Sequence, residues 1–278
     1  MEKELAQLST LAHEGRNAIF RLLMRRYPDA VPAGEITAAL SLKPSTASAH
    51  LAALRETGLI TQTRQGTSLL YRADTGAAQG LVDFLFSECC RGRPDICPPA
   101  MTLPAKGAGT MPDKTYSVLF ICTGNSARSI IAETLLRDMG AGRFTVHSAG
   151  TQPYSELNPL AVRMLAQKGH DVTGLRAKNV AEFQGESAPA LDFVFTVCDR
   201  AANEECPPWQ GQPITAHWGL PDPVKAEGTE AQRMLAFQQT YGLLKNRIAA
   251  FTALPFDALD AVSLQSRLDD IASEGETA

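Results

Sequence analysis

The fold of the larger half of this chain is decided by one segment, Tyr116-Ser-Val-Leu-Phe-Ile-Cys-Thr-Gly-Asn-Ser-Ala-Arg-Ser129. Its first six residues have the pattern of a buried strand that leads directly into Cys122. A short loop follows, and a helix is predicted to begin near Arg128. In a loop of this kind, successive backbone N–H groups and the N-terminus of the helix form a concave binding site for an anion.

This setting predicts a reactive thiol. The anion-binding loop and the Arg128 guanidinium are expected to lower the pKa of the Cys122 thiol and to keep it as a thiolate. Arg128 can also hold a tetrahedral oxyanion through two parallel hydrogen bonds. A buried structural cysteine beside an unrelated arginine is the alternative, and the strand–loop–helix setting argues against it. The other residues predicted to surround the anion are Thr123, Gly124, Asn125, Ser126, Ala127 and Ser129.

Strands and helices alternate beyond this segment, which predicts an α/β domain with a parallel sheet covered by helices on both faces. The domain is expected to span residues 114–254, and residues 255–278 are left as a C-terminal tail with a weak helical pattern. The expected strands are 116–121, 145–149, 191–197 and 214–217, and the expected helices are 126–139, 159–168 and 229–253.

Residues 98–113 are rich in proline and glycine and have no periodicity, so we expect them to be a linker. The 278 residues exceed the usual size of one domain, which agrees with two domains. No stretch approaches the ~18 apolar residues of a membrane span. The charged start, Met1-Glu2-Lys3-Glu4-Leu5, lacks the apolar core of a signal peptide and predicts a cytoplasmic protein. In that reducing compartment, the six cysteines are expected to be ligands or nucleophiles.

Residues 1–97 have the pattern of a small, mostly helical domain. A helix over 44–56, preceded by a shorter one over 34–40 and followed by a β-hairpin, predicts a winged helix-turn-helix that binds DNA. A last helix is expected over 77–88. The net charge of −4 gives no general affinity for nucleic acids, so binding has to depend on a local patch. A helical domain with a solvated face fits the periodicity equally. The side chains expected to contact DNA are Ser45, Thr46, Ser48, His50 and, at the hairpin tip, Arg64.

Three cysteines, Cys89, Cys90 and Cys97, lie at and beyond the end of the last helix of this domain. Three thiolates suit a soft, thiophilic ion. Adjacent residues on a helix do not share a face, so the three sulfurs converge only if the helix ends near Cys90. The alternatives are buried apolar cysteines and a zinc site, although structural zinc prefers four ligands.

The segment Leu40-Ser-Leu-Lys-Pro-Ser-Thr-Ala-Ser-Ala-His-Leu-Ala-Ala-Leu-Arg-Glu-Thr-Gly-Leu59 resembles the recognition helix of ArsR-type metalloregulators. The hairpin that ends in Leu70-Tyr71-Arg72 is similar to their wing, and the resemblance covers residues 5–97. It implies a homodimer, formed through this domain, that represses transcription by binding operator DNA. It also implies arsenite as the inducer, bound by the three cysteines. Ala49 departs from the family, which often has arginine there.

Residues 115–254 resemble the low-molecular-weight tyrosine phosphatase fold and, within it, the arsenate reductases. Two segments favour the reductases: Val197-Cys-Asp-Arg-Ala-Ala-Asn-Glu-Glu-Cys206, and Ala216-His-Trp-Gly-Leu-Pro-Asp-Pro223. Phosphatases of this fold place an aromatic residue after the Asp-Pro pair, where this chain has Val224. Two alternatives remain: a tyrosine phosphatase fused to a regulator, and a regulator whose second domain only binds an oxyanion.

The resemblance to the reductases implies a mechanism. Cys122 attacks arsenate while Asp222 protonates the departing oxygen, and Cys198 then attacks Cys122 so that arsenite leaves. Cys206 next attacks Cys198, and a thioredoxin-like protein reduces the resulting disulfide. No tightly bound cofactor is implied, because the electrons come from an external thiol: thioredoxin, glutaredoxin with glutathione, or mycothiol.

Overall fold

The computed structural model describes residues 2–90, 115–154, 156–185, 187–205, 209 and 212–273. The chain divides into two compact units, Met1–Ala108 and Gly109–Ala278. The predicted linker, residues 98–113, lies outside the described residues. Among the residues that are described, no helix combines the length and the apolar character needed to cross a membrane.

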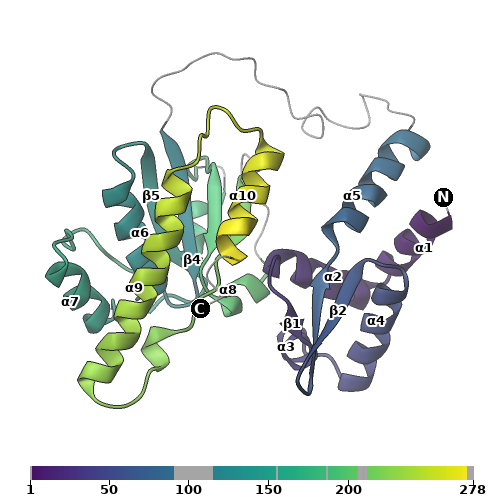
Figure 1. Cartoon of the computed structure of the whole chain (residues 1–278), viewed down its shortest axis with the longest axis horizontal. Helices are drawn as coiled ribbons and strands as arrows, with labels where there is room; N and C mark the ends of the chain where they lie inside the picture. Colours follow the sequence, from purple (N-terminus) through teal and green to yellow (C-terminus); the bar gives the residue numbers. More distant parts are fainter. Residues whose placement is uncertain are drawn as a thin grey trace. The chain divides into compact units, whose positions relative to one another are not determined.

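The first unit combines a helix-turn-helix with a three-stranded sheet in the order β1-β3-β2, and β1 comes before the helices of the motif. Helix α4 has the predicted bounds, and the hairpin of β2 and β3 is the predicted wing (Figure 1). The elements, in chain order, are α1 (Glu2–Leu11), α2 (Glu14–Arg26), β1 (Val31–Pro32), α3 (Ala33–Ala39), α4 (Pro44–Glu56), β2 (Ile60–Gln65), β3 (Ser68–Ala73), α5 (Thr75–Phe84) and the π-helix η1 (Leu85–Cys89).

The core of this unit follows the helical spacing of its apolar residues. Ile19 and Leu22 on α2 are fully buried, as are Ile36 on α3 and Leu54 on α4. Residues three or four positions apart on a helix share a face, so one side of each helix enters the core. Helix α4 therefore turns its opposite side, with Ser45 and Ser48, to the surface.

The second unit is an α/β domain with a four-stranded parallel sheet in the order β5-β4-β6-β7, as predicted. Helix α6 packs on β4 and β5, and α9 lies alongside α6 (Figure 1). The elements are β4 (Tyr116–Cys122), α6 (Arg128–Met139), β5 (Phe144–Gly150), α7 (Pro159–Gln167), the 3-10 helix η2 (Val180–Phe183), β6 (Phe193–Thr196), α8 (Asp199–Asn203), β7 (Ile214–His217), the 3-10 helix η3 (Pro223–Lys225), α9 (Glu230–Thr252) and α10 (Ala261–Ser273).

The residues after position 254, left as a tail by the sequence, contain helix α10, and this helix belongs to the same core. Leu264, Leu268 and Ile271 are buried against the apolar residues of the second unit. Helix α10 packs on the edge strand β7 and on α9. The indole nitrogen of Trp218 donates to Leu268 O over 3.3 Å. The predicted boundary at 254 is therefore wrong, because the apolar face of a short amphipathic helix does not reveal which surface it covers.

Helix α10 gives the second unit a pH-dependent stability. Burial raises the pKa of the Asp269 carboxyl to about 6. Since the folded pKa exceeds the unfolded one, the native state holds an extra proton between about pH 4 and pH 6, and stability falls as the pH rises through this window. Asp269→Asn is expected to remove this fall and to raise the free energy of unfolding at pH 7. The expected gain is about 1 kcal/mol, a figure that already includes a reduction for solvent screening, because the Asp269 side chain is only partly buried.

Urea unfolding at pH 4.5 and pH 7 checks this expectation. The comparison is Asp270→Asn, which removes the exposed neighbour on the same helix and its smaller contribution to the raised Asp269 pKa, so most of the fall is expected to remain. A pH-dependent loss that persists in Asp269→Asn would show that another group is responsible.

Candidate functional site

The four parallel strands end at one edge of the sheet, and this edge collects the residues with the predicted chemistry. Cys122 is the last residue of β4, and Cys198 follows the neighbouring strand β6. Because β4 and β6 run in the same direction, the two cysteines come together. Cys198 Sγ lies 3.5 Å from the hydroxyl of Thr123, the residue after Cys122. The structure thus brings together two of the three cysteines predicted for catalysis, while Cys206 lies outside the described residues.

The loop after Cys122 is held from inside by a buried asparagine. Asn125 adopts a φ of 44°, in the left-handed region, which asparagine tolerates better than most residues. Its amide nitrogen donates to the hydroxyls of Ser129 and Ser148, both over 2.8 Å. Its amide oxygen accepts from the backbone N–H of Lys178 over 2.7 Å. These hydrogen bonds therefore hold the loop from within.

The N-terminus of α6 faces this loop without a side-chain cap. Ala127, the residue before the helix, makes no side-chain hydrogen bond to the first turn. The first N–H groups of a helix have no partner within the helix, and together with the helix dipole they favour an anion. The N-terminus of α6 can therefore bind an anion.

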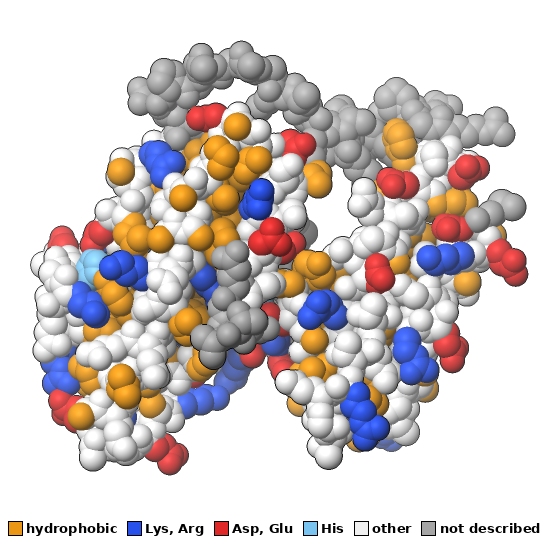
Figure 2. All heavy atoms as spheres, in the orientation of Figure 1, with side chains coloured by type: hydrophobic (Ala, Val, Ile, Leu, Met, Phe, Trp, Pro, Cys, Tyr) orange, Lys and Arg blue, Asp and Glu red, His pale blue; other side chains and the backbone are white. Residues whose placement is uncertain are grey.

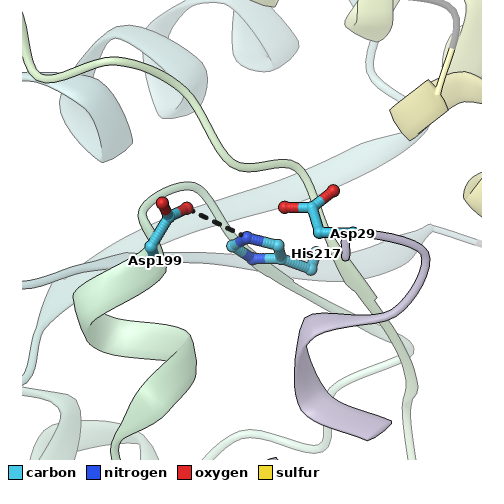
Figure 3. A group of neighbouring side chains, drawn as sticks. All are labelled: Asp29, Asp199 and His217. Carbon is cyan, nitrogen blue, oxygen red and sulfur yellow. Dashed lines mark hydrogen bonds and ion pairs between the residues drawn. The ribbon is translucent and has the colours of Figure 1, made fainter. Parts of the chain in front are cut away.

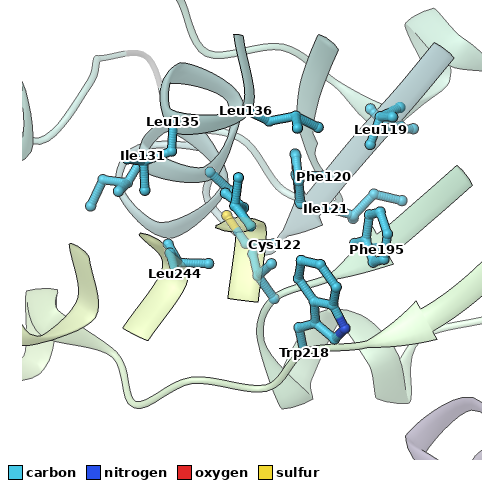
Figure 4. Close-up of a cluster of buried hydrophobic side chains, with 14 of the residues drawn as sticks. Leu119, Phe120, Ile121, Cys122, Ile131, Leu135, Leu136, Phe195, Trp218 and Leu244 are labelled. Atoms are coloured by element: carbon cyan, nitrogen blue, oxygen red, sulfur yellow. The ribbon is translucent and has the colours of Figure 1, made fainter. Parts of the chain in front are cut away.

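The Cys122 sulfur is almost completely buried within the apolar cluster that includes Leu244 and Trp218 (Figure 4). Ser129 Oγ lies 3.0 Å from it, and the Asn125 N–H donates to it over 3.2 Å. Burial raises the pKa of the Cys122 thiol, and the nearby Cys198 raises it further. The hydrogen bonds of Ser129 and the charge of Arg128 act in the opposite direction but do not prevail.

The sequence-based expectation of a lowered Cys122 pKa is therefore wrong for this arrangement. The sequence identified the groups that stabilise a thiolate, and two of them, Ser129 and Arg128, do lower the pKa. It did not reveal how fully the sulfur is shielded from water, and the loss of hydration disfavours the charged form.

Arg128 and Asp222 form an ion pair at the rim of the loop. Arg128 Nη2 lies 2.9 Å from Asp222 Oδ2, and Nη1 donates to Leu220 O over 3.0 Å. Arg128 Nε is buried and has no hydrogen-bond partner among the described residues. A buried donor without an acceptor is costly, and an oxyanion oxygen would supply the acceptor. Asp222 Oδ1 in turn accepts from the N–H of Val224 over 3.2 Å, which fixes the carboxylate at the start of η3.

The end of β5 leaves no room for a side chain next to the loop. A Cβ on Gly150 would lie 2.6 Å from Thr123 O and 3.0 Å from Asn125 N, both backbone atoms. Gly150→Ala is therefore expected to displace the loop. We expect kcat/KM for p-nitrophenyl phosphate, used as a test substrate, to fall about a hundredfold, because small misplacements of reacting groups slow a reaction strongly. The control is Gly174→Ala, since a Cβ there meets nothing within 4 Å.

The measurement is p-nitrophenyl phosphate hydrolysis, with phosphate as a competing anion. Wild-type kinetics in Gly150→Ala would show that the loop tolerates the displacement.

Several residues of this site carry no signal in the sequence. Ser148 accepts from Asn125 and also bonds Glu133, which forms a 3.1 Å ion pair with the buried Lys178. The ring of Tyr154 lies on Gly124, where a Cβ would come within 2.6 Å of it. These residues come from distant segments, so only the fold brings them to the loop.

In the first unit, the structure separates the predicted DNA-contacting residues into two groups. Ser45, Ser48 and Arg64 are exposed, and Thr46 is half-buried. The His50 ring instead lies 4.6 Å from the ring of His13 at the start of α2, and burial lowers the His50 pKa. His50 is therefore less accessible for contact with DNA than the sequence suggested.

The last helix of the first unit ends at the first of the three predicted arsenite ligands. The π-helix η1 ends at Cys89, and Cys90 caps it, with its N–H donating to Leu85 O over 2.9 Å. Cys89 is exposed, Cys90 is half-buried, and both are free thiols. Single π-helical turns are rare in proteins, and those that occur are often located at functional sites. The third predicted ligand, Cys97, lies outside the described residues.

Two family models match the chain. Residues 117–262 match the low molecular weight phosphotyrosine protein phosphatase family, and residues 11–63 match a helix-turn-helix domain. The match to the phosphatase family contains the loop, Arg128, Cys198 and Asp222.

Curated relatives resemble the second unit along most of their own length. An arsenate reductase from Oceanobacillus iheyensis is 33% identical over 134 residues, which are 48% of this chain and 93% of the relative. The arsenate reductase of Bacillus subtilis is 32% identical, with the same coverage. A glutaredoxin arsenate reductase from Synechocystis sp. is 30% identical over 47% of this chain and 92% of its own length. A solved arsenate reductase in the reduced state is 27% identical, with a TM-score of 0.41 over 50% of this chain and 98% of its own.

Proposed function

Since this chain belongs to the low molecular weight phosphotyrosine protein phosphatase family and carries a helix-turn-helix domain before that region, we propose that it is an arsenate reductase joined to an arsenite-responsive repressor. The relatives that match the second unit along nine-tenths of their own length are arsenate reductases, and they support this substrate.

The observation that carries the proposal is the pair of buried thiols at neighbouring strand ends. Hydrolysis of a phosphate ester in such a loop needs only one cysteine. Here Cys198 is placed beside the loop of Cys122, next to the hydroxyl of Thr123. A second thiol at this place is explained by a reaction that oxidises two thiols to a disulfide.

The first step is attack on arsenate held against Arg128 and the loop. The arsenate dianion is itself a base and can accept the proton of the Cys122 thiol as it arrives. Cys122 Sγ then attacks arsenic, and the Asp222 carboxylate relays that proton to the oxygen that departs as water. The product is a covalent Cys122–arsenic adduct.

The second step is the electron transfer. Cys198 loses its proton to water and attacks Cys122 Sγ, so that the S–S bond forms and the S–As bond breaks. The bonding pair stays on arsenic, which leaves as arsenite. Two thiols are oxidised to one disulfide, and As(V) is reduced to As(III). Cys206 then attacks Cys198 and displaces the Cys122 thiolate, which leaves a Cys198–Cys206 disulfide. A thioredoxin-like protein reduces this disulfide.

The test is arsenate turnover by the full chain, assayed separately with thioredoxin, glutaredoxin–glutathione and mycothiol systems. We expect the thioredoxin system to support turnover. If none of the three systems supports arsenate reduction, the proposed activity is refuted. The alternative activity, a tyrosine phosphatase, predicts efficient hydrolysis of phosphotyrosine peptides, but the residue after the Asp222–Pro223 pair is Val224 rather than an aromatic ring.

For the first unit, we propose a homodimer that binds operator DNA in the cytoplasm. The exposed face of α4 and the hairpin tip at Arg64 would contact the DNA. Large apolar side chains are exposed on α1, α5 and η1, namely Leu5, Val82 and Leu85, at 53%, 42% and 36%. Figure 2 shows hydrophobic side chains over these elements. A second copy of the unit would cover them, and a twofold protein suits a twofold operator.

The arsenite sensor is proposed to be Cys89, Cys90 and Cys97. Replacing Cys89 and Cys90 together by serine is expected to leave operator affinity unchanged and to abolish its loss on addition of arsenite, because the soft ion loses two of its three sulfur ligands. Operator binding measured by fluorescence anisotropy, with and without arsenite, checks this. The control variant is Cys122→Ser, which removes a thiol of the other unit. If arsenite still releases the doubly substituted protein from the operator, the inducer binds at a site other than these cysteines.

A further inference from the structure

We propose that His217 is a positioning residue for Cys198, which it holds against the loop of Cys122 through the side chains on either side of that cysteine. This inference rests on the proposed function, because it assigns His217 to the second step of the reduction.

His217 is buried, with 1% of its surface exposed, and it contacts both flanks of Cys198. Its Nδ1 lies 2.7 Å from the hydroxyl of Thr196, two residues before Cys198. Its Nε2 lies 3.3 Å from Asp199 Oδ1, directly after Cys198 (Figure 3). One imidazole ring thus fixes the short segment that carries the second thiol.

The other side of His217 is anchored to the loop that carries Asp222. A Cβ on Gly219 would lie 2.7 Å from His217 Nε2 and 2.8 Å from Asp199 Oδ1, so both groups pack directly on the backbone of this loop. Arg247 on α9 donates to Gly219 O over 3.1 Å and, through its other terminal nitrogen, to Ala272 O of α10 over 2.9 Å. His217 therefore rests on a base that α9 and α10 hold in place.

Cys198 needs such a support because its own element is short. Helix α8 has five residues, and Cys198 lies just before it in extended backbone without a side-chain cap. For the S–S bond to form, Cys198 Sγ has to approach Cys122 Sγ from the side opposite the breaking S–As bond. The rate of disulfide formation therefore depends on the exact position of Cys198 Sγ. The earlier attack of Cys122 on arsenate does not depend on it.

The chain supplies a matched control for the His217–Asp199 pair. His170 makes the same two kinds of contact, through Nδ1 to the carboxylate of Asp138 and through Nε2 to the hydroxyl of Tyr241 over 2.9 Å. Asp138 lies near the C-terminal end of α6, whereas the loop of Cys122 adjoins the N-terminus of this helix. Removal of the Asp138 carboxylate therefore tests the loss of a histidine–aspartate pair in general.

The experiment compares Asp199→Ala, Asp199→Asn and Asp138→Ala in the full chain with Cys206→Ser, so that a Cys122–Cys198 disulfide is the end point. Two rates are measured: p-nitrophenyl phosphate hydrolysis, which needs no second cysteine, and formation of the Cys122–Cys198 disulfide with excess arsenate, followed by mass spectrometry after alkylation. Asp199→Ala is expected to slow disulfide formation about tenfold while p-nitrophenyl phosphate hydrolysis stays at the wild-type rate. Asp199→Asn, which keeps an acceptor for His217, is expected to recover most of the rate, and Asp138→Ala to leave both rates unchanged.

Three results would overturn the inference: an unchanged disulfide rate in Asp199→Ala, a parallel loss of both rates, or an equal effect of Asp138→Ala. Failure of the proposed function looks different, because arsenate then produces no disulfide even with Asp199 intact. In that case, diamide replaces arsenate as the oxidant of the two thiols. The same ranking of variants is expected with diamide if His217 positions Cys198, and equal diamide rates would overturn the inference.

Discussion

Replacing Cys122 by serine is expected to abolish arsenate reduction, with a loss of kcat/KM of about four orders of magnitude or more, because a serine hydroxyl is a far weaker nucleophile than a thiolate. The fold is expected to survive, since the two side chains differ only in one buried atom. The measurement is arsenate turnover with the thioredoxin system, and p-nitrophenyl phosphate hydrolysis is expected to fall with it.

Cys198→Ser is the matched control, because it changes the neighbouring buried thiol. It is expected to stop arsenate turnover after at most one arsenite per enzyme while p-nitrophenyl phosphate hydrolysis continues. The two variants therefore separate the nucleophile from the second thiol. Sustained arsenate turnover by Cys122→Ser would rule out the proposed mechanism.

Arg128→Lys is expected to lower kcat/KM for p-nitrophenyl phosphate by about two to three orders of magnitude, comparable to the loss of a donor to a developing oxyanion. The guanidinium places several N–H donors in one plane, whereas an ammonium group is a point charge on a flexible chain. Lysine would also lose one of the contacts to Asp222 and Leu220 O that orient the arginine. Inhibition by phosphate is expected to weaken in parallel.

Arg163→Lys is the control for this prediction. Arg163 also pairs with a carboxylate, that of Glu230, but both side chains are largely exposed, at 45% and 61%. Exposed ion pairs contribute little, so the kinetics are expected to stay at the wild-type values. Equal kinetics for Arg128→Lys and the wild-type protein would remove Arg128 from the oxyanion site.

Much of the fold could be predicted because its elements follow from local patterns. Residues 118–122 of β4 form a continuous apolar run and are buried throughout, as a strand covered on both faces of a parallel sheet requires. Helix Pro44–Glu56 begins with proline in its first turn and ends before Gly58, whose φ is 73°. Helix Ala261–Ser273 has an equally regular apolar face, but which surface that face covers depends on the position of β7.

The sequence by itself determined the two-domain organisation, the parallel sheet, and the cysteine, arginine and loop that can bind an oxyanion. It could do so because the strand, the loop and the helix of that segment are contiguous, and their chemistry depends on residue type and spacing. Only the tertiary structure decided the environment of those groups. The upward shift of the Cys122 pKa, the pairing of Arg128 with Asp222 and the contacts of His217 on both sides of Cys198 all depend on burial and on segments far apart in the chain. Desolvation and hydrogen bonding act through space, so their balance is set only when the strands lie side by side.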